Sequence, residues 1–264
     1  MRLLIIGAGN MGGAIARGLL DAGALAPAEL GLVDPSPDTL APLASRGCAT
    51  FTGAPEALRS LAPDTALLLA VKPQMFGALA QEIAPTSCGR LVASIMAGVN
   101  TARLASALPG ARLVRTMPNL GVTINAGLTA IADSDEPDLA TVEAWFRTVG
   151  ATLRLPEDQL DAFTAVAGSG PAYVFLLAEA MIEGATRAGI GASDARAMVE
   201  RTISAAAGLL TSSDLSPEQW RARVTSKGGT TQAAIEVMQT CHVPEAIASA
   251  ILAARDRARE LSRA

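Results

Sequence analysis

Aromatic residues, histidine and cysteine are scarce in this chain of 264 residues, where Phe, Trp and Tyr make up 3% and one histidine and three cysteines occur. The 50% of hydrophobic residues must therefore build an aliphatic, alanine-rich core. Cys48, Cys88 and Cys241 lie far apart, without CxxC or Cys/His ligand spacing. We expect no metal site, no disulfide and a reducing, cytoplasmic location.

Strong net charge and long apolar runs are also missing. A net charge of −4 provides neither the basic footprint of a nucleic-acid-binding protein nor a polybasic membrane patch. The N-terminal apolar run stops at Gly7, short of the roughly 7 to 15 residues of a signal-peptide core. No other apolar stretch approaches the ~20 residues of a membrane span. We expect neither nucleic acid nor a membrane as a partner.

Short apolar runs alternate with helical patterns in the first half of the chain. This alternation predicts an α/β fold with a parallel, doubly wound sheet of the Rossmann type, covered by helices on both faces. The domain is expected to span residues 1–155. The runs that read as strands are 3–6, 30–33, 66–71, 91–95, 112–115 and 126–131.

Residues 156–264 lack strand patterns and predict an all-helical domain, with helices at about 172–189, 194–211 and 244–261. Ser193 and Asp194 are candidate caps of the second helix, and Pro244 suits the start of the third. Small residues leave some turns without a wide polar face, so these helices must be buried. Subunit association would bury them; a compact monomeric bundle is the alternative.

A glycine turn follows the first predicted strand and opens a helical pattern, in the sequence Gly7-Ala8-Gly9-Asn10-Met11-Gly12. In a βαβ unit the first glycine makes the tight turn, the second lets the backbone approach a pyrophosphate, and the third lets the helix pack on the strand. The pyrophosphate would lie on the N–H groups at the start of the helix near Met11. This order predicts a dinucleotide site.

Residues 224–231, Val-Thr-Ser-Lys-Gly-Gly-Thr-Thr, offer a second anion site. Paired glycines among hydroxyl residues can direct several backbone N–H groups toward one small carboxylate. A helix start capped by Thr or Ser is the structural alternative, and both can hold, since a helix N-terminus itself binds anions. Together with the dinucleotide site, the loop indicates an oxidoreductase for a small acid.

Six stretches, in order and with their spacing, make the whole chain resemble the pyrroline-5-carboxylate reductase family. They are the glycine turn 7–12, Ala-Val-Lys-Pro-Gln at 70–74, Ser-Ile-Met-Ala-Gly-Val at 94–99, Arg-Thr-Met-Pro-Asn at 115–119, Gly-Ser-Gly-Pro-Ala-Tyr at 168–173 and the loop 224–231. The resemblance implies reduction of 1-pyrroline-5-carboxylate to L-proline by hydride transfer from NAD(P)H, the last step of proline biosynthesis. It also implies a homodimer joined through the helical domains, with a decamer or another ring of dimers as a larger assembly.

The resemblance also implies roles for individual residues. Thr231 would hydrogen-bond the ring nitrogen as the catalytic residue, and four neighbours would hold the substrate carboxylate: Ser226, Gly228, Gly229 and Thr230. The cofactor side would comprise Gly7, Gly9, Asn10, Met11, Gly12, Asp34, Ser36, Ala70, Val71, Lys72, Pro73, Met96, Ala97 and Asn119. Lys227 departs from the family's usual proline, and Leu120-Gly121 departs from its usual continuation after the asparagine.

The choice between NADPH and NADH depends on Asp34, at the end of the second predicted strand. An acid there usually accepts from a ribose 2′-OH and repels a 2′-phosphate. The family typically prefers NADPH, yet no arginine lies beside Asp34, and Ser36 is the only nearby hydroxyl. Both cofactors therefore stay open.

Hydride transfer needs no nucleophile or metal, because the cofactor supplies the reactive group and the protein supplies orientation. The lone histidine, His242, reads as a capping or surface residue. One alternative is a related reductase of imines or of 2-keto or β-hydroxy acids, which commonly place a lysine or glutamate on the first helix of the second domain; Glu179 and Glu183 occur there. The other is a catalytically inactive nucleotide sensor.

Overall fold

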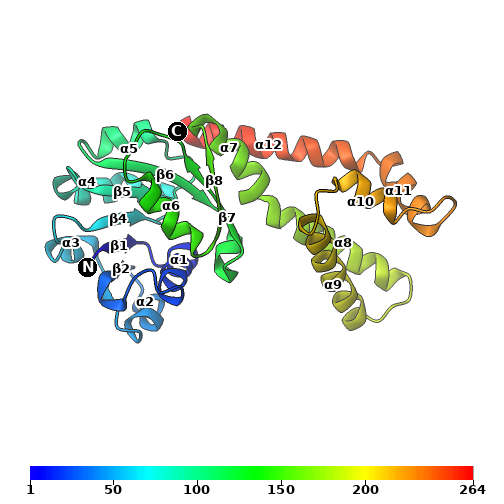
Figure 1. The fold of residues 1–264 in the computed structure, drawn as a ribbon, viewed down its shortest axis with the longest axis horizontal. Coiled ribbons are helices and arrows are strands. Elements are labelled where there is room, and N and C mark those ends of the chain that lie inside the picture. Colours follow the sequence, from blue (N-terminus) through cyan, green and yellow to red (C-terminus); the bar gives the residue numbers. More distant parts are fainter. Residues whose placement is uncertain (264) are drawn as a thin grey trace. The chain divides into compact units, whose positions relative to one another are not determined.

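The computed structural model describes residues 1–263, which form two compact units. The first contains Met1–Ser169 together with the C-terminal residues from Ala254 onward, and the second is Gly170–Ala253. Residues 156–169 and the end of the last helix therefore group with the sheet, because their contacts are made with its last strands and loops. Figure 1 shows the elements of each unit.

The first unit is built on one sheet with the strand order β3-β2-β1-β4-β5-β6-β7-β8. Neighbouring strands are parallel except β6 and β7, which are antiparallel. The register places Ile6 beside Val33 on one side and Leu69 on the other. The strands are β1 (Leu3–Ile6), β2 (Leu30–Val33), β3 (Ala49–Phe51), β4 (Ala66–Leu69), β5 (Leu91–Ser94), β6 (Arg112–Pro118), β7 (Gly127–Ala132) and β8 (Gly150–Leu155).

Helices cover both faces of this sheet (Figure 1), as predicted for a doubly wound fold. Side chains alternate across β1: Leu3 and Ile5 join the core under α1, α2 and α6, whereas Leu4 and Ile6 join the core under α3, α4 and α5. The helices are α1 (Asn10–Asp21), α2 (Pro37–Ala44), α3 (Ala54–Arg59), α4 (Phe76–Ser87), α5 (Thr101–Ala107), α6 (Leu139–Arg147) and α7 (Leu160–Phe163). Shorter turns are η1 (Pro27–Glu29), η2 (Pro73–Met75), η3 (Leu120–Ile124), η4 (Glu157–Gln159) and η5 (Thr164–Gly168).

Three features of the sheet differ from the prediction. Strands β3 and β8 are additional, and β7 reverses direction, so the sheet is mostly rather than wholly parallel. The two added strands lie at the edges and are half-exposed, so they lack the continuous apolar run of a buried strand. The parallel pair β7 and β8 places Gly127 against Gly150, where a Cβ on Gly150 would stand 2.0 Å from the Gly127 carbonyl oxygen.

The second unit is helical, as predicted, and contains α8 (Gly170–Arg187), α9 (Ala192–Thr211), α10 (Pro217–Arg223), α11 (Thr230–Thr240) and most of α12 (Val243–Arg263). Pro244 lies at the start of α12, as expected. The cap predicted for α9 is wrong: Gly191 is the N-cap, and Ser193 and Asp194 lie within the first turn. The extended backbone of Gly191 starts the helix before either side chain can cap it.

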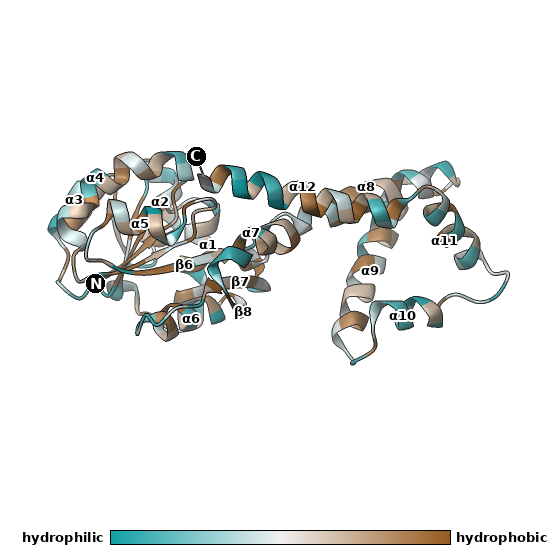
Figure 2. Ribbon diagram, turned by 90° about the horizontal axis from the view of Figure 1, so that it is seen from above, coloured by the Kyte–Doolittle hydropathy of each residue, from teal (hydrophilic) through white to brown (hydrophobic). Residues whose placement is uncertain are grey.

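Apolar side chains of this unit are mostly exposed. Within α8, α9, α10 and α11, only Ala195 and Val199 are buried, while Phe175 is 55% and Leu176 65% exposed. Figure 2 shows hydrophobic residues along the buried strands of the sheet and again along these helices. A lone copy of this unit therefore lacks a core of its own.

One segment, Glu157–Arg187, is long and apolar enough by length and composition to cross a membrane, and 6% of its most apolar part is buried. The expectation that no stretch approaches a span is wrong on those two criteria, because η4, α7, η5 and α8 follow one another with only Ser169 between η5 and α8. The test is weak evidence, since a helix that packs against other protein also passes it.

Candidate functional site

The glycine turn joins β1 to α1 at the point where the strand order reverses between β1 and β4. Gly7 has φ of +102°, and a Cβ there would stand 2.6 Å from the Ala70 carbonyl oxygen. A Cβ on Gly12 would stand 1.9 Å from the Gly7 carbonyl oxygen. A Cβ on Gly9, in contrast, would meet nothing within 4 Å. The fold itself requires glycine at 7 and 12, whereas the open space at Gly9 is room for a ligand.

The N-terminus of α1 can receive an anion. Gly9 is its N-cap, no side chain caps it, and no acidic residue lies in its first turn. The first intrahelical bond runs from the Gly13 N–H to the Gly9 carbonyl at 2.8 Å, so the N–H groups of Asn10, Met11 and Gly12 lack helical partners. With the space at Gly9, these residues fit the pyrophosphate of a dinucleotide.

Asp34 follows β2 directly and is half-buried beside the glycine turn. Its Oδ2 accepts from the Ala8 N–H at 3.1 Å, and its Oδ1 accepts from the Ser36 N–H at 3.0 Å. Ser36, not Asp34, is the N-cap of α2. Within residues 1–263, no arginine or lysine forms an ion pair with Asp34. The carboxylate is thus fixed at the edge of the dinucleotide site with its charge uncompensated by a cation.

The turn after β4 borders the same edge of the sheet. The Ala70 N–H donates to the Ile6 carbonyl at 2.8 Å, so the ends of β4 and β1 lie together. Val71 and Pro73 are half-buried and Lys72 is exposed, as the N-cap of η2. Backbone and side chains of this turn can therefore border a bound dinucleotide.

Met96 and Asn119 prove to be anchored within the protein. Met96 is 2% exposed and packs in the core under α4, so Met96 can face a ligand only through its backbone, whereas Ala97 is half-buried. The Asn119 carboxamide oxygen accepts from the N–H groups of Gly121 (3.1 Å) and Leu128 (3.0 Å). Asn119 thereby shapes the turn after β6, a local role that its position in the motif did not indicate.

The loop 224–231 lies in the second unit, between α10 and α11. Helix α11 begins at Thr230 with Gly229 as its N-cap and without a side-chain cap, so the predicted helix start is present but the predicted Thr or Ser cap is not. Gly228 has φ of +71°, and a Cβ on Gly229 would stand 2.4 Å from Ser226 Oγ. Thr231 is half-buried. Glycine at 228 and 229 thus serves the loop. The Gly229 N–H donates to the Ser226 carbonyl at 3.0 Å, so the hydroxyls and the N–H groups at the start of α11, which lack helical partners, are the groups that suit a carboxylate.

Gln232 is a candidate site residue that the motif did not predict. Its side-chain oxygen accepts from the Gly228 N–H at 2.7 Å, and its amide donates to Glu236 at 2.7 Å. The relevant signal is its place one helical turn after Gly228. Lys227, by contrast, is exposed and forms no ion pair in the described part of the chain.

His242 and Ser216 have local roles. His242 has φ of +55° and joins α11 to α12, in agreement with the expected surface role. The cap of α10 is Ser216, which forms a reciprocal capping box with Gln219.

A doubly wound sheet with a glycine turn at its switch point and an uncapped helix behind it defines a dinucleotide-binding protein of the Rossmann type. Comparison with known proteins narrows this class. Residues 157–261 match the family model for pyrroline-5-carboxylate reductase dimerisation, and residues 2–98 match that for NADP oxidoreductase, coenzyme F420-dependent.

The chain belongs to the pyrroline-5-carboxylate reductase family, which confirms the resemblance found in its motifs. It is 37% identical to a pyrroline-5-carboxylate reductase of Thermus thermophilus over 99% of this chain and 98% of that protein. It is 33% identical to one of Mycobacterium tuberculosis over 98% and 96% of the two chains. A solved pyrroline-5-carboxylate reductase of Coxiella burnetii superposes with a TM-score of 0.88 at 32% identity, over 99% and 98% of the two chains.

Proposed function

We propose that the protein reduces 1-pyrroline-5-carboxylate to L-proline with NAD(P)H. The observation that carries the proposal is that one chain of this family combines an open, anion-receptive turn at Gly9 with an uncapped helix start at Thr230. Each suits one reactant, the first a dinucleotide and the second a small carboxylate. The reaction would complete proline biosynthesis in the cytoplasm.

The dinucleotide would lie across the carboxyl ends of the strands. The N–H groups of Asn10, Met11 and Gly12 hold its pyrophosphate, Asp34 and Ser36 lie at its adenosine ribose, and residues 70–73 with Met96 and Ala97 border its other half. Bound there, the dihydronicotinamide would supply a hydride to the C=N carbon, and the imine nitrogen would take its proton from solvent. The protein's part is to fix that ring against the sheet edge and to exclude water from it.

The substrate carboxylate would be held by Ser226, Gly228, Gly229 and Thr230, with Thr231 donating or accepting at the ring nitrogen. In the structure the Gly228 N–H donates to the Gln232 side-chain oxygen. A bound carboxylate would take that N–H instead, because a charged acceptor makes the stronger hydrogen bond. The helix dipole of α11 adds to its stabilisation.

We further propose a homodimer formed through the helical part, which we assign to residues 156–264, with residues 1–155 as the cofactor domain. A hollow of about 610 Å³, lined by apolar side chains of α8 and α12 such as Leu177 and Ile247, lies open in the second unit. Burial of each such side chain is worth about 1.5–3 kcal/mol. A decamer or other ring of dimers would be a further step.

Phe175→Glu tests the assembly, with Ile124→Glu as its control. Both residues are exposed, at 55% and 77%, but Ile124 lies in η3 of the sheet unit. Light scattering should give a dimer or larger for the wild-type protein and for Ile124→Glu, and a smaller species for Phe175→Glu. A wild-type monomer at micromolar concentration would contradict the proposed dimer.

The reaction is tested by following loss of NADPH, and separately NADH, with purified protein and pyrroline-5-carboxylate. Pyruvate serves as the control acid. Rapid oxidation with the imine alone is the expected result. Cofactor binding without oxidation would favour a different imine or keto acid, or a nucleotide sensor, and would refute the proposed reaction.

A further inference from the structure

The loop that follows β5, residues 95–100, is held in place at its start, its middle and its end. Its start is fixed when the Met96 N–H donates to Ser94 Oγ at 3.2 Å. Gly98, with φ of +73°, lies so close to α12 that a Cβ there would stand 3.2 Å from the Leu261 carbonyl. The last helix of the chain therefore packs directly on this loop.

The end of the loop is held by Glu157. Its Oε1 accepts from the backbone N–H of Thr101 at 2.7 Å and from the Thr101 hydroxyl at 2.8 Å. Thr101 is the first residue of α5, so Glu157 satisfies an N–H that the helix cannot. Glu157 and Thr101 are 56 positions apart in the chain, and the bond joins the segment after β8 to the start of α5, where the loop ends.

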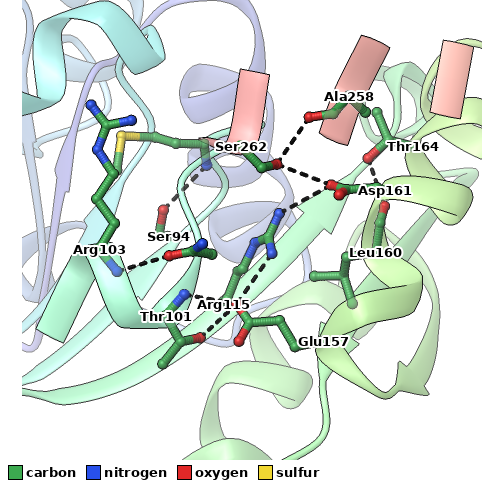
Figure 3. Close-up of polar contacts among 12 residues, drawn as sticks. Ser94, Thr101, Arg103, Arg115, Glu157, Leu160, Asp161, Thr164, Ala258 and Ser262 are labelled. Atoms are coloured by element: carbon green, nitrogen blue, oxygen red, sulfur yellow. Dashed lines mark hydrogen bonds and ion pairs between the residues drawn. The ribbon is translucent and has the colours of Figure 1, made fainter. Parts of the chain in front are cut away.

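Arg115 fixes Glu157 in turn (Figure 3). Its guanidinium donates to the same Oε1 at 3.1 Å and lies 3.7 Å from Asp161, and its side chain is 6% exposed. Ser262 of α12 donates to Asp161 at 3.2 Å. Arg115 lies beside Ser94 in the register of β5 and β6. The buried Arg115, which lies beside the start of the loop, thus pairs with Glu157 and Asp161. Glu157 in turn bonds Thr101 at the end of the loop.

We propose that Glu157 is a positioning residue for the cofactor. It holds the loop 95–100 in the position in which the backbone of Met96 and Ala97 contacts the nicotinamide half of the bound cofactor. The inference rests on the proposed function, because it takes that loop as the nicotinamide border. Without the carboxylate, Thr101 loses a charged acceptor and Arg115 loses its nearest partner, so the loop gains freedom that cofactor binding must remove.

Glu157→Gln tests this proposal, with Glu143→Gln as a matched control. Glu143 is also bonded to arginines and a threonine, namely Arg147, Arg154 and Thr152, but its side chain is 11% exposed against 35% for Glu157, and it links α6 to the edge strand β8. Both variants should lose thermal stability. Only Glu157→Gln should raise the KM and Kd for NAD(P)H, by about tenfold, which corresponds to about 1.4 kcal/mol, while the KM for pyrroline-5-carboxylate stays near the wild-type value.

ADP-ribose and its 2′-phosphate provide an internal control, because they carry the pyrophosphate but no nicotinamide. Their affinity should be equal in wild-type protein and Glu157→Gln, since the glycine turn is unchanged. Equal NAD(P)H affinity in the wild type and Glu157→Gln would overturn the inference, as would an equal loss in Glu143→Gln or an equal loss of ADP-ribose binding.

Thr101→Val keeps the test decisive if Glu157→Gln does not fold. It removes the hydroxyl bond and retains the backbone bond, so the Kd for NAD(P)H should rise about threefold; an unchanged Kd would overturn the inference. A wild-type protein that binds no NAD(P)H would instead refute the proposed function, which separates the two failures.

Discussion

Asp34→Asn should shift the cofactor preference strongly toward NADPH. The side chain keeps its shape and one carbonyl oxygen, so it can still accept from the Ser36 N–H, as Asp34 does at 3.0 Å. The asparagine lacks the negative charge and the second acceptor oxygen, which in the wild-type protein accepts from the Ala8 N–H. Since no cation within residues 1–263 pairs with Asp34, removal of the charge leaves no partner unsatisfied except that N–H.

The magnitude follows from the position of the carboxylate at the edge of the site. Two unit charges about 4 Å apart repel by about 1 kcal/mol in bulk water and about 4 kcal/mol at an effective dielectric of 20. A phosphate monoester carries about −1.5 to −2 charges. Asp34 is half-buried, so we take the repulsion expected in bulk water, which is about 1.5–2 kcal/mol for a phosphate of this charge. Its removal corresponds to a gain in kcat/KM for NADPH of about 10- to 30-fold.

NADH should respond in the opposite direction. Each Asp34 oxygen already accepts one bond and retains room for another, as a ribose 2′-OH requires. Loss of a charged hydrogen bond costs about 1.5–3 kcal/mol, so kcat/KM for NADH should fall at least about tenfold. The ratio of the NADPH to the NADH value should thus rise at least about 100-fold.

Steady-state kinetics with both cofactors and one preparation measure this ratio. The lost bond from Ala8 loosens the turn for both cofactors, so it lowers both values and cancels in the ratio. Thermal unfolding of the apoprotein reports that structural cost separately. If the ratio of kcat/KM for NADPH to kcat/KM for NADH does not change, the assignment of Asp34 to the ribose is refuted, whether the two separate values rise or fall.

Three further predictions concern other parts of the molecule. Thr231→Val should lower kcat by up to about 10²-fold and leave the Kd for NAD(P)H unchanged; wild-type turnover in this variant would exclude the assigned role of the Thr231 hydroxyl. Lys227→Pro should weaken the dependence of the substrate KM on ionic strength, because the exposed Lys227 has no ion-pair partner among the described residues and its charge near the carboxylate is screened by salt; an identical salt response in both proteins would argue against this effect. The hydrogen bond from Arg154, with smaller contributions from Thr152 and Arg147, holds the pKa of Glu143 below its ordinary value of 4.5. The stabilisation from ionised Glu143 is therefore complete above pH 4.5 and is lost as the pH falls through the lower pKa of the folded state. The difference in unfolding free energy between wild type and Glu143→Gln, measured by urea unfolding, should shrink on acidification. A difference that does not change with pH would contradict this prediction.

Much of the fold and of the candidate site could be predicted from the sequence, because some local patterns carry their own physical reason. Strands β1, β2, β4 and β5 are buried on both faces and read as short, mostly apolar runs. Gly7 and Gly12 are fixed by clashes that any side chain would make with nearby backbone. The helical character of the second unit follows from its many helix-forming residues and from the helical spacing of its apolar residues.

Other features depend on residues that are far apart in the chain. The edge strands β3 and β8 are half-exposed, so tertiary pairing and not apolarity makes them strands. The anchored side chains of Met96 and Asn119 followed from no motif.

The amino-acid sequence by itself determined the family, the two kinds of fold and the two anion-receptive turns, since each is encoded by neighbours along the chain. Only the tertiary structure decided that Asp34 binds the Ala8 N–H and that Glu157 binds Thr101. These contacts join segments 26 and 56 residues apart. Their geometry is set by the twist and order of the sheet, which no local pattern specifies.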